Sequence, residues 1–142
     1  MLTQRSRYAI RALLALAKAP PGIPVPLRLI ALEARVPRKF LEIILTEMKR
    51  AGFIETTRGK AGGYRLARAP HLISFGEIIR VIEGPLALVP CVSRTAYRPC
   101  ADCVDEASCA IRKAMMIVRD DTARILDGTS LADAVSDQLA AA

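Results

Sequence analysis

Apolar residues recur at helical spacing in three segments near the beginning of the chain. Residues 4–19 predict a first helix, which the following prolines and glycine end. A second helix is expected to begin with Pro26 at its first helical position, and Pro37 opens a third helix that Gly52 ends as a left-handed cap. The short connection between these two helices is typical of a helix-turn-helix. One face of the third helix is apolar, with Phe40, Leu41, Ile44, Leu45 and Met48.

The pattern changes to that of a β-hairpin directly after the third helix. A β-rich run over residues 53–57 precedes a glycine-punctuated turn, and residues 64–66 form the returning run. Two helices joined by a tight turn and followed by a basic hairpin have the order of a winged helix-turn-helix. Apolar residues make up 52% of the chain and aromatic residues 4%, which favours a helical protein over a β-sandwich.

Helical spacing returns in the second half of the chain. A fourth helix is expected before Gly84, with a capping box formed by Ser74 and Glu77 at its start. The longest helix is predicted over residues 108–127, and a short one should begin at Ser130. No segment approaches the roughly 20 apolar residues that a membrane-spanning helix needs.

Lysine and arginine are concentrated in the first half of the chain. Residues 1–70 contain 14 basic and 4 acidic residues, a net charge of +10, whereas residues 71–142 contain 7 and 10, a net charge of −3. A basic unit of this kind favours a polyanionic partner, with nucleic acid ahead of a membrane surface. A generic basic surface would carry the same charge, so the positions of the charged residues matter more than their number.

Those positions indicate how double-stranded DNA would be bound. The third predicted helix of the chain would be the second helix of the helix-turn-helix motif, which lies in the major groove of DNA. There, lysine or arginine can donate to guanine, and Glu42 can accept from the N4 amino group of cytosine. The hairpin tip, Arg58-Gly59-Lys60, is a cationic finger that suits the minor groove. The alternative is a solvated helix face beside an ordinary turn. The predicted DNA-binding residues are Arg38, Lys39, Glu42, Thr46, Lys49, Arg50, Arg58 and Lys60.

All four cysteines, Cys91, Cys100, Cys103 and Cys109, lie within nineteen residues. The apolar run over residues 12–17 is too short for a secretory signal, so we expect a cytoplasmic protein. In that compartment a thiol cluster favours a metal or redox site over a structural disulfide. Four thiolates can hold an iron–sulfur cluster, 2Fe–2S or 4Fe–4S, or a tetrahedral zinc ion. A disulfide switch between Cys100 and Cys103 is the third alternative.

Several stretches resemble the Rrf-two family of bacterial winged-helix transcription regulators, which includes the IscR, NsrR, RirA and CymR regulators. They are RYAIRALLALA, FLEIILTEMKRAGFIETTRGKAGGYRLAR, ISFGEIIRVIEG and CAIRKAMMIVRD, and the hairpin RGKAGGYRLAR is the most specific. The resemblance covers nearly the whole chain and implies a homodimer in which the long C-terminal helix crosses that of its partner. It also implies that Glu42 and Arg58 occupy base-reading and minor-groove positions. The dimerisation residues would then include Ile111, Met115, Val118 and Ile125.

The resemblance also suggests which cysteines bind a cluster. Family members with clusters use three cysteines in this region, and Cys91, Cys103 and Cys109 match them best. Some relatives take a fourth ligand from a histidine one turn beyond the last cysteine, but this chain has Arg112 there. We expect Cys100 to be the fourth ligand, and the alternatives are an exogenous ligand or an incomplete cluster. Other family members have no cluster and sense metabolites or partner proteins.

These observations predict a mainly α protein with a winged helix-turn-helix, one β-hairpin wing and a long C-terminal dimerisation helix. Its parts are a DNA-binding domain (1–84), a cysteine-containing sensor loop (85–109), and a dimerisation helix with a C-terminal tail (110–142). We expect a cytoplasmic, homodimeric transcriptional regulator, a repressor, whose binding to a palindromic DNA operator is controlled by an iron–sulfur cluster. The alternatives are a zinc- or thiol-switched regulator of the same fold and an iron–sulfur carrier that does not bind DNA. An enzyme is not expected, because the sequence has no catalytic triad, no phosphate loop and one histidine.

Overall fold

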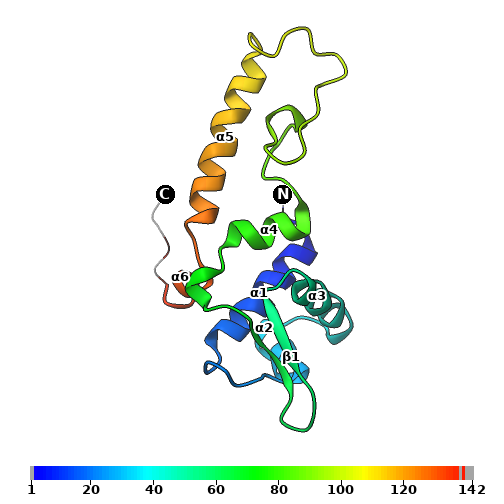
Figure 1. The fold of residues 1–142 in the computed structure, drawn as a ribbon, viewed down its shortest axis with the longest axis vertical. Coiled ribbons are helices and arrows are strands. Elements are labelled where there is room, and N and C mark those ends of the chain that lie inside the picture. Colours follow the sequence, from blue (N-terminus) through cyan, green and yellow to red (C-terminus); the bar gives the residue numbers. More distant parts are fainter. Residues whose placement is uncertain (1, 138, 140–142) are drawn as a thin grey trace.

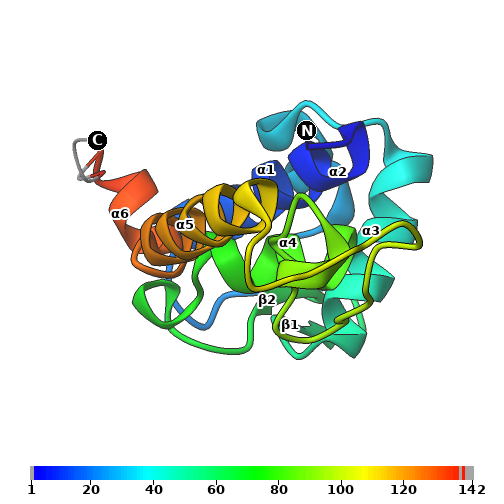
Figure 2. The ribbon, with the colours of Figure 1, turned by 90° about the horizontal axis from the view of Figure 1, so that it is seen from above.

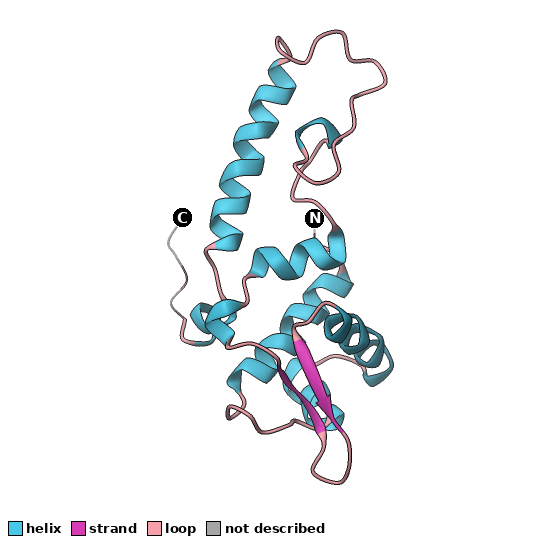
Figure 3. Ribbon diagram, in the orientation of Figure 1, coloured by secondary structure: helices cyan, strands magenta, loops and turns pink. Residues whose placement is uncertain are grey.

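The computed structural model describes residues 2–137 and 139, which form a mainly helical protein with one two-stranded sheet (Figures 1 and 3). Among these residues no helix is long and apolar enough to cross a membrane. Two short 3-10 helices, η1 (Pro70–Leu72) and η2 (Pro90–Val92), lie between the longer elements. The other elements are α1 (Gln4–Lys18), α2 (Leu27–Ala34), α3 (Arg38–Arg50), β1 (Ile54–Thr57), β2 (Gly63–Leu66), α4 (Phe75–Glu83), α5 (Ala110–Asp127) and α6 (Leu131–Val135).

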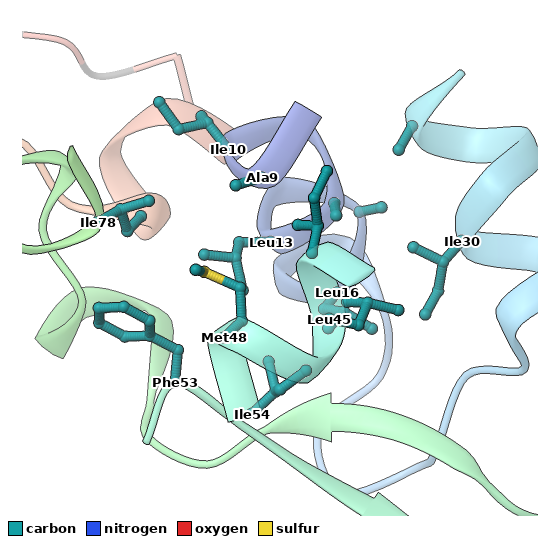
Figure 4. Close-up of a cluster of buried hydrophobic side chains, with 14 of the residues drawn as sticks. Ala9, Ile10, Leu13, Leu16, Ile30, Leu45, Met48, Phe53, Ile54 and Ile78 are labelled. Atoms are coloured by element: carbon teal, nitrogen blue, oxygen red, sulfur yellow. The ribbon is translucent and has the colours of Figure 1, made fainter. Parts of the chain in front are cut away.

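The core of the protein is built around α1, against which α2, α3, α4 and α6 pack. Leu13 of α1 and Leu45 and Met48 of α3 are fully buried and belong to one cluster with Phe53 and Ile54 at the start of the hairpin (Figure 4). Burial of these side chains holds one face of α3 against α1. The opposite face of α3 is therefore directed to solvent.

The end of α3 leads directly into the hairpin through a left-handed turn at Gly52. This glycine has φ +83°, which a residue with a Cβ adopts only at a cost. Its N–H donates to the carbonyl of Lys49 at 3.0 Å, and the N–H of Phe53 donates to that of Met48 at 3.0 Å. These two bonds satisfy carbonyls at the helix end and confirm the predicted glycine cap.

The wing is an antiparallel pair, β1–β2, that is also attached to the segment before α2. Thr56 pairs with Tyr64 and Thr57 with Gly63 across the hairpin. On its other side Tyr64 exchanges two backbone hydrogen bonds with Val25, of 2.8 and 2.9 Å. A Cβ at Gly63 would lie 2.3 Å from the carbonyl oxygen of Val25, so the wing approaches this segment as closely as it does only because residue 63 is glycine.

The chain after the long helix returns to the winged-helix body. Leu131 of α6 is fully buried in the same cluster as the core of α1 and α3. Its N–H donates to the carbonyl of Ile73, and the N–H of Phe75 donates to the carbonyl of Thr129, both at 2.9 Å. Seen along the long axis, α6 lies on the side of the molecule away from α3 (Figure 2). The segment predicted as a C-terminal tail therefore supplies part of the core of the first domain.

The helix boundaries differ slightly from the predicted ones. Pro26 and Pro37 are N-caps, outside the first helical position, because each has an extended backbone while its carbonyl accepts the first helical hydrogen bonds. The long helix begins at Ala110 and not at Ser108, whose N–H instead donates to the Asp105 carboxylate at 3.2 Å. Phe40, predicted on the buried face of α3, is 44% exposed and packs its ring against Tyr8 at the edge of the core.

The carboxylate of Glu83 joins the end of α4 to the start of α1, and this contact should make stability depend on pH. It accepts from the N–H of Thr3 at 2.8 Å, from the Thr3 hydroxyl at 2.7 Å and from the Ser6 hydroxyl. The Ser6 and Thr3 hydrogen bonds lower the pKa of Glu83 from its ordinary 4.5 to about 2. A carboxyl whose pKa is lowered by folding stabilises the protein above its ordinary pKa, and this contribution disappears as the pH falls through the folded value.

We therefore expect the Glu83→Gln variant to be less stable than the wild type near neutral pH, and the difference to shrink as the pH falls from 4.5 to about 2. Urea unfolding at several pH values would measure it. A difference that stays constant over this range would contradict the assignment of the shift to Glu83.

Candidate functional site

The outer face of α3 and the tip of the wing form one cationic surface. All eight residues predicted to bind DNA are exposed. Within the residues that the structure describes, none of the six cations on this surface forms an ion pair with a carboxylate. These six are Arg38, Lys39, Lys49, Arg50, Arg58 and Lys60. Charges without an internal partner are available to phosphate oxygens, so this surface is suited to a polyanion.

Two of the predicted residues are partly occupied by contacts within the protein. The Nζ of Lys49 donates to the hydroxyl of Thr56 at 3.0 Å, which links the last turn of α3 to the wing. The hydroxyl of Thr46 donates to the backbone carbonyl of Glu42 at 2.8 Å. Lys49 therefore helps to set the position of the wing relative to α3, a role that the sequence did not indicate.

Sequence reasoning overlooked one side chain on this surface. Ile43 is 64% exposed and lies on the outer face of α3 among the predicted DNA-binding residues. The helical spacing alone could have identified it, because Ile43 does not share the face of Leu41, Ile44, Leu45 and Met48.

The four cysteines line a single cavity of about 370 Å³ between the cysteine loop (residues 85–109, which includes η2) and the beginning of α5. Cys91 is buried, Cys109 is half-buried, and Cys100 and Cys103 are exposed. Val89, Ile111 and Val104 contribute apolar surface, and Asp102, Asp105 and Glu106 contribute carboxylates. The structure therefore brings together all four residues that were predicted as metal ligands.

The four cysteine sulfurs do not surround a common point in this structure. In the described part of the chain, no three His, Cys, Asp or Glu side chains are close enough together to hold a metal ion. Loss of surrounding water raises the pKa of Cys100 and of Cys103, and the neighbouring Cys91 and Glu106 add to the respective effects. In the metal-free protein these two groups are therefore neutral thiols at pH 7, and coordination would release their protons.

Cys109 is the N-cap of α5, and Arg112 lies one turn beyond it. The Cys109 sulfur accepts a hydrogen bond from the N–H of Arg112 at 3.4 Å. The Nε of Arg112 is buried and has no hydrogen-bond partner within residues 2–137 and 139, although the Glu106 carboxylate is 3.8 Å away. A buried N–H without a partner is costly, and it is available to an acceptor in the cavity that Arg112 lines.

Two arginine contacts join the cysteine loop to α5, and a third joins α4 to α5. Arg119 of α5 donates to the carbonyl of Val92, directly after Cys91, at 2.8 Å. Arg94 pairs with Asp120 at 3.1 Å. The third, Arg80 of α4, pairs with Asp127 through both carboxylate oxygens, and its hydrogen bond lowers the pKa of Asp127. A displacement of the loop near Cys91 would therefore act on α5 directly.

The helix α5 leaves its apolar stripe uncovered within one chain. None of its eighteen residues is buried. Of the predicted dimerisation residues, Ile111 is 68% exposed, Val118 and Ile125 are exposed, and Met115 is half-buried. An apolar face of this length usually lies against another surface.

Comparison with known proteins places these features in a family. Residues 2–137 match the Rrf2 family, which is described as an iron-dependent transcriptional regulator. An rrf2-like HTH-type transcriptional regulator of Rhodobacter capsulatus is 43% identical over 136 residues, which are 94% of this chain and 91% of that protein.

Two solved structures have the same fold. The structure of CymR (YrzC), the global cysteine regulator of Bacillus subtilis, matches with a TM-score of 0.79 at 30% identity. The match covers 96% of this chain and 97% of the CymR chain. The structure of T. potens IscR matches with a TM-score of 0.76 at 26% identity, and the match covers 97% of this chain and 88% of the IscR chain. These likenesses confirm the predicted winged helix-turn-helix.

Proposed function

Because this chain belongs to the Rrf2 family of transcriptional regulators, we propose that it is a DNA-binding regulator whose binding to an operator is controlled by a cysteine-ligated iron–sulfur cluster. Regulation of transcription through DNA binding follows from the family, and its members are not enzymes. Control by a cluster, assembly as a homodimer, repression and the palindromic operator are our proposals for this chain.

The main support for a cluster is that all four cysteines line one cavity. Cysteine thiolates are the usual ligands of iron–sulfur clusters, so the donor set fits. Cys91, Cys103 and Cys109 would bind the cluster with Cys100 as the fourth ligand, and the unpartnered Nε of Arg112 would donate to it. When bound, such a cluster supplies a group that can be gained, oxidised or lost in response to a signal.

Homodimer formation is supported by the uncovered stripe of α5. Ile111, Val118 and Ile125 recur along this helix at spacings that keep them on one side, and they are exposed in the single chain. The same stripe of a second copy would cover them. A twofold dimer places two α3 helices one helical turn of DNA apart, about 34 Å, and would bind a palindrome.

The arginine contacts supply a route from the cavity to the DNA-binding surface. When Cys91 and Cys109 are drawn toward a common centre, η2 and the start of α5 approach each other. Arg119 holds Val92 to α5, and Arg80 holds α4 to the other end of α5. A change in the loop would thus alter the position of each winged helix relative to the dimer helix, and so favour one of two dimer geometries.

The alternatives are less well supported by the site. A structural zinc ion needs four ligands about 2.3 Å from one point. The sequence contains one C-x-x-C pair, Cys100 and Cys103, whereas a four-cysteine zinc site usually has two such pairs. A thiol switch between Cys100 and Cys103 uses only two of the four thiols. A carrier without DNA binding leaves the cationic surface of α3 and the wing without a function.

The proposal is tested by isolating the full chain without oxygen. We expect a coloured protein that contains iron and acid-labile sulfide. Its affinity for an operator chosen from random duplex DNA should differ from that of the same protein after removal of the cluster by about 5–150-fold, the usual range of coupling between two sites. A colourless protein loaded with zinc would contradict cluster control, and equal affinities would contradict the proposed coupling.

A further inference from the structure

Ile43 is an exposed apolar side chain on the outer face of α3, where its neighbours along the helix are polar except for the partly exposed Phe40. It lies on a line along α3 with Lys39, Thr46 and Arg50, at spacings of four, three and four residues. This line is opposite the buried face, and the side chain of Ile43 is 64% exposed. Its position has no explanation in the packing of a single chain.

The surroundings of Ile43 are not those of an apolar docking patch. Phe40 is turned aside, with its ring 6.3 Å from that of Tyr8, and the Nζ of Lys39 lies 5.0 Å from the Phe40 ring. The remaining neighbours along the outer line carry a hydroxyl or a positive charge. An isolated apolar group within a cationic surface fits the floor of a DNA groove better than the apolar centre of a protein interface.

We propose that Ile43 contacts the 5-methyl group of a thymine in each half of the operator, an inference that rests on the proposed DNA-binding role of α3. The major groove presents hydrogen-bond donors and acceptors at every base pair, but its one apolar group is the methyl of thymine. Contact between the Ile43 side chain and this methyl removes apolar surface of both from water. Ile43 is therefore a specificity-determining residue.

Ile43 and Glu42 should contact different base pairs. Successive residues of a helix point about 100° apart. Glu42 lies seven residues before Lys49, on the side of α3 that faces the wing, where Lys49 contacts Thr56 at 3.0 Å. Ile43 lies farther from the wing, near the midline of the outer face. The thymine that it contacts is thus separate from any cytosine bound by Glu42.

Replacement of thymine by deoxyuridine tests this inference, because deoxyuridine pairs in the same way but lacks the methyl group. The full chain is first used to select a site from random duplex DNA, and each thymine of that site is then replaced in turn. For the wild type we expect one thymine in each half-site whose replacement weakens binding about fourfold, and about 16-fold when both are replaced. For Ile43→Ala we expect weaker binding to the original site and no further loss with deoxyuridine.

Two control variants separate this contact from general effects. Ile23→Ala removes an isoleucine that is 58% exposed between α1 and α2, and should keep the sensitivity to deoxyuridine. Ile43→Gln preserves the length of the side chain and the helix, but should lose that sensitivity as Ile43→Ala does.

Other results would overturn the inference. It fails if no thymine of the site is sensitive to loss of its methyl, or if the sensitivity persists in both Ile43 variants. A defect of Ile43→Ala in regulation, with an unchanged deoxyuridine profile, would assign the side chain to a protein partner instead. If no duplex is selected, the proposed DNA binding by α3 is contradicted. If a duplex is selected but its binding does not depend on any thymine methyl group, only the inference about Ile43 is contradicted.

Discussion

Replacing Cys103 by serine should yield a protein that, isolated without oxygen, contains neither iron nor acid-labile sulfide. Cys103 is exposed at the rim of the cavity that the other three cysteines line, and serine keeps its size but loses the thiolate. Replacing a residue that only hydrogen-bonds to a metal ligand lowers metal affinity by about 10–100-fold. Replacing the ligand itself should lower it further. The operator affinity of this variant should equal that of the wild type after its cluster has been removed.

The matched control for this variant is the neighbouring residue. Val104 also lines the cavity but is fully exposed and has no metal-binding group, so Val104→Ser should retain iron, sulfide and wild-type operator affinity. Iron and sulfide assays, visible absorption and fluorescence anisotropy with a labelled duplex provide the measurements. The ligand assignment fails if Cys103→Ser keeps its full iron content. Sensing through the thiols fails if a variant without any of the four cysteines binds DNA as the loaded wild type does.

The Gly63→Ala variant should be strongly destabilised and bind DNA poorly. Gly63 has φ +152°, and an added Cβ would lie 2.3 Å from the carbonyl oxygen and 2.5 Å from the carbonyl carbon of Val25. Both are backbone atoms, so relief requires that the wing and the segment before α2 separate. Two hydrogen bonds between Val25 and Tyr64 would then be weakened, and with the backbone strain we expect a loss of about 2–4 kcal/mol in unfolding free energy.

The effect of Gly63→Ala on DNA binding follows from the displaced wing. Arg58 and Lys60 at the wing tip would no longer reach the duplex together with α3, and loss of one good base contact alone costs about 1–3 kcal/mol, roughly tenfold or more in affinity. Gly59→Ala is the control, because Gly59 also has a positive φ, +104°, but nothing lies within 4 Å of an added Cβ. Urea unfolding and anisotropy measure both effects. Equal losses in the two variants would show that the close approach to Val25 is not important.

Much of the fold was predictable because each boundary has a local chemical cause. The Ser74–Glu77 capping box, the turn at Gly52 and the hairpin over residues 54–66 lie where the sequence places them. The errors came from one local turn before α5 and from one contact between distant residues. Asp105 bends the chain before α5 by accepting backbone hydrogen bonds, and Phe40 turns toward Tyr8, and neither partner is visible in helical spacing.

The candidate site was predictable in its residue types but not in its geometry. Cysteine spacing alone gave the four candidate ligands, and the structure places them around one cavity without gathering them at a point. The arginine contacts of Arg119 and Arg80 could not be anticipated, because their partners are 27 and 47 residues away. The sequence also could not show that Lys49 contacts the wing, since that depends on the angle between α3 and β1.

The burial of Leu131 has a consequence for how the protein can be divided. The side chain completes a buried hydrophobic cluster whose other members all lie between residues 9 and 79, yet it follows the cysteine loop and α5 in the sequence. A fragment cut at residue 84 would therefore leave a cavity in this cluster between α1 and η1 and lose the backbone hydrogen bond from Leu131 to Ile73. During synthesis the complete core of the winged helix can therefore form only after the cysteine loop and α5 have been made, because Leu131 follows both.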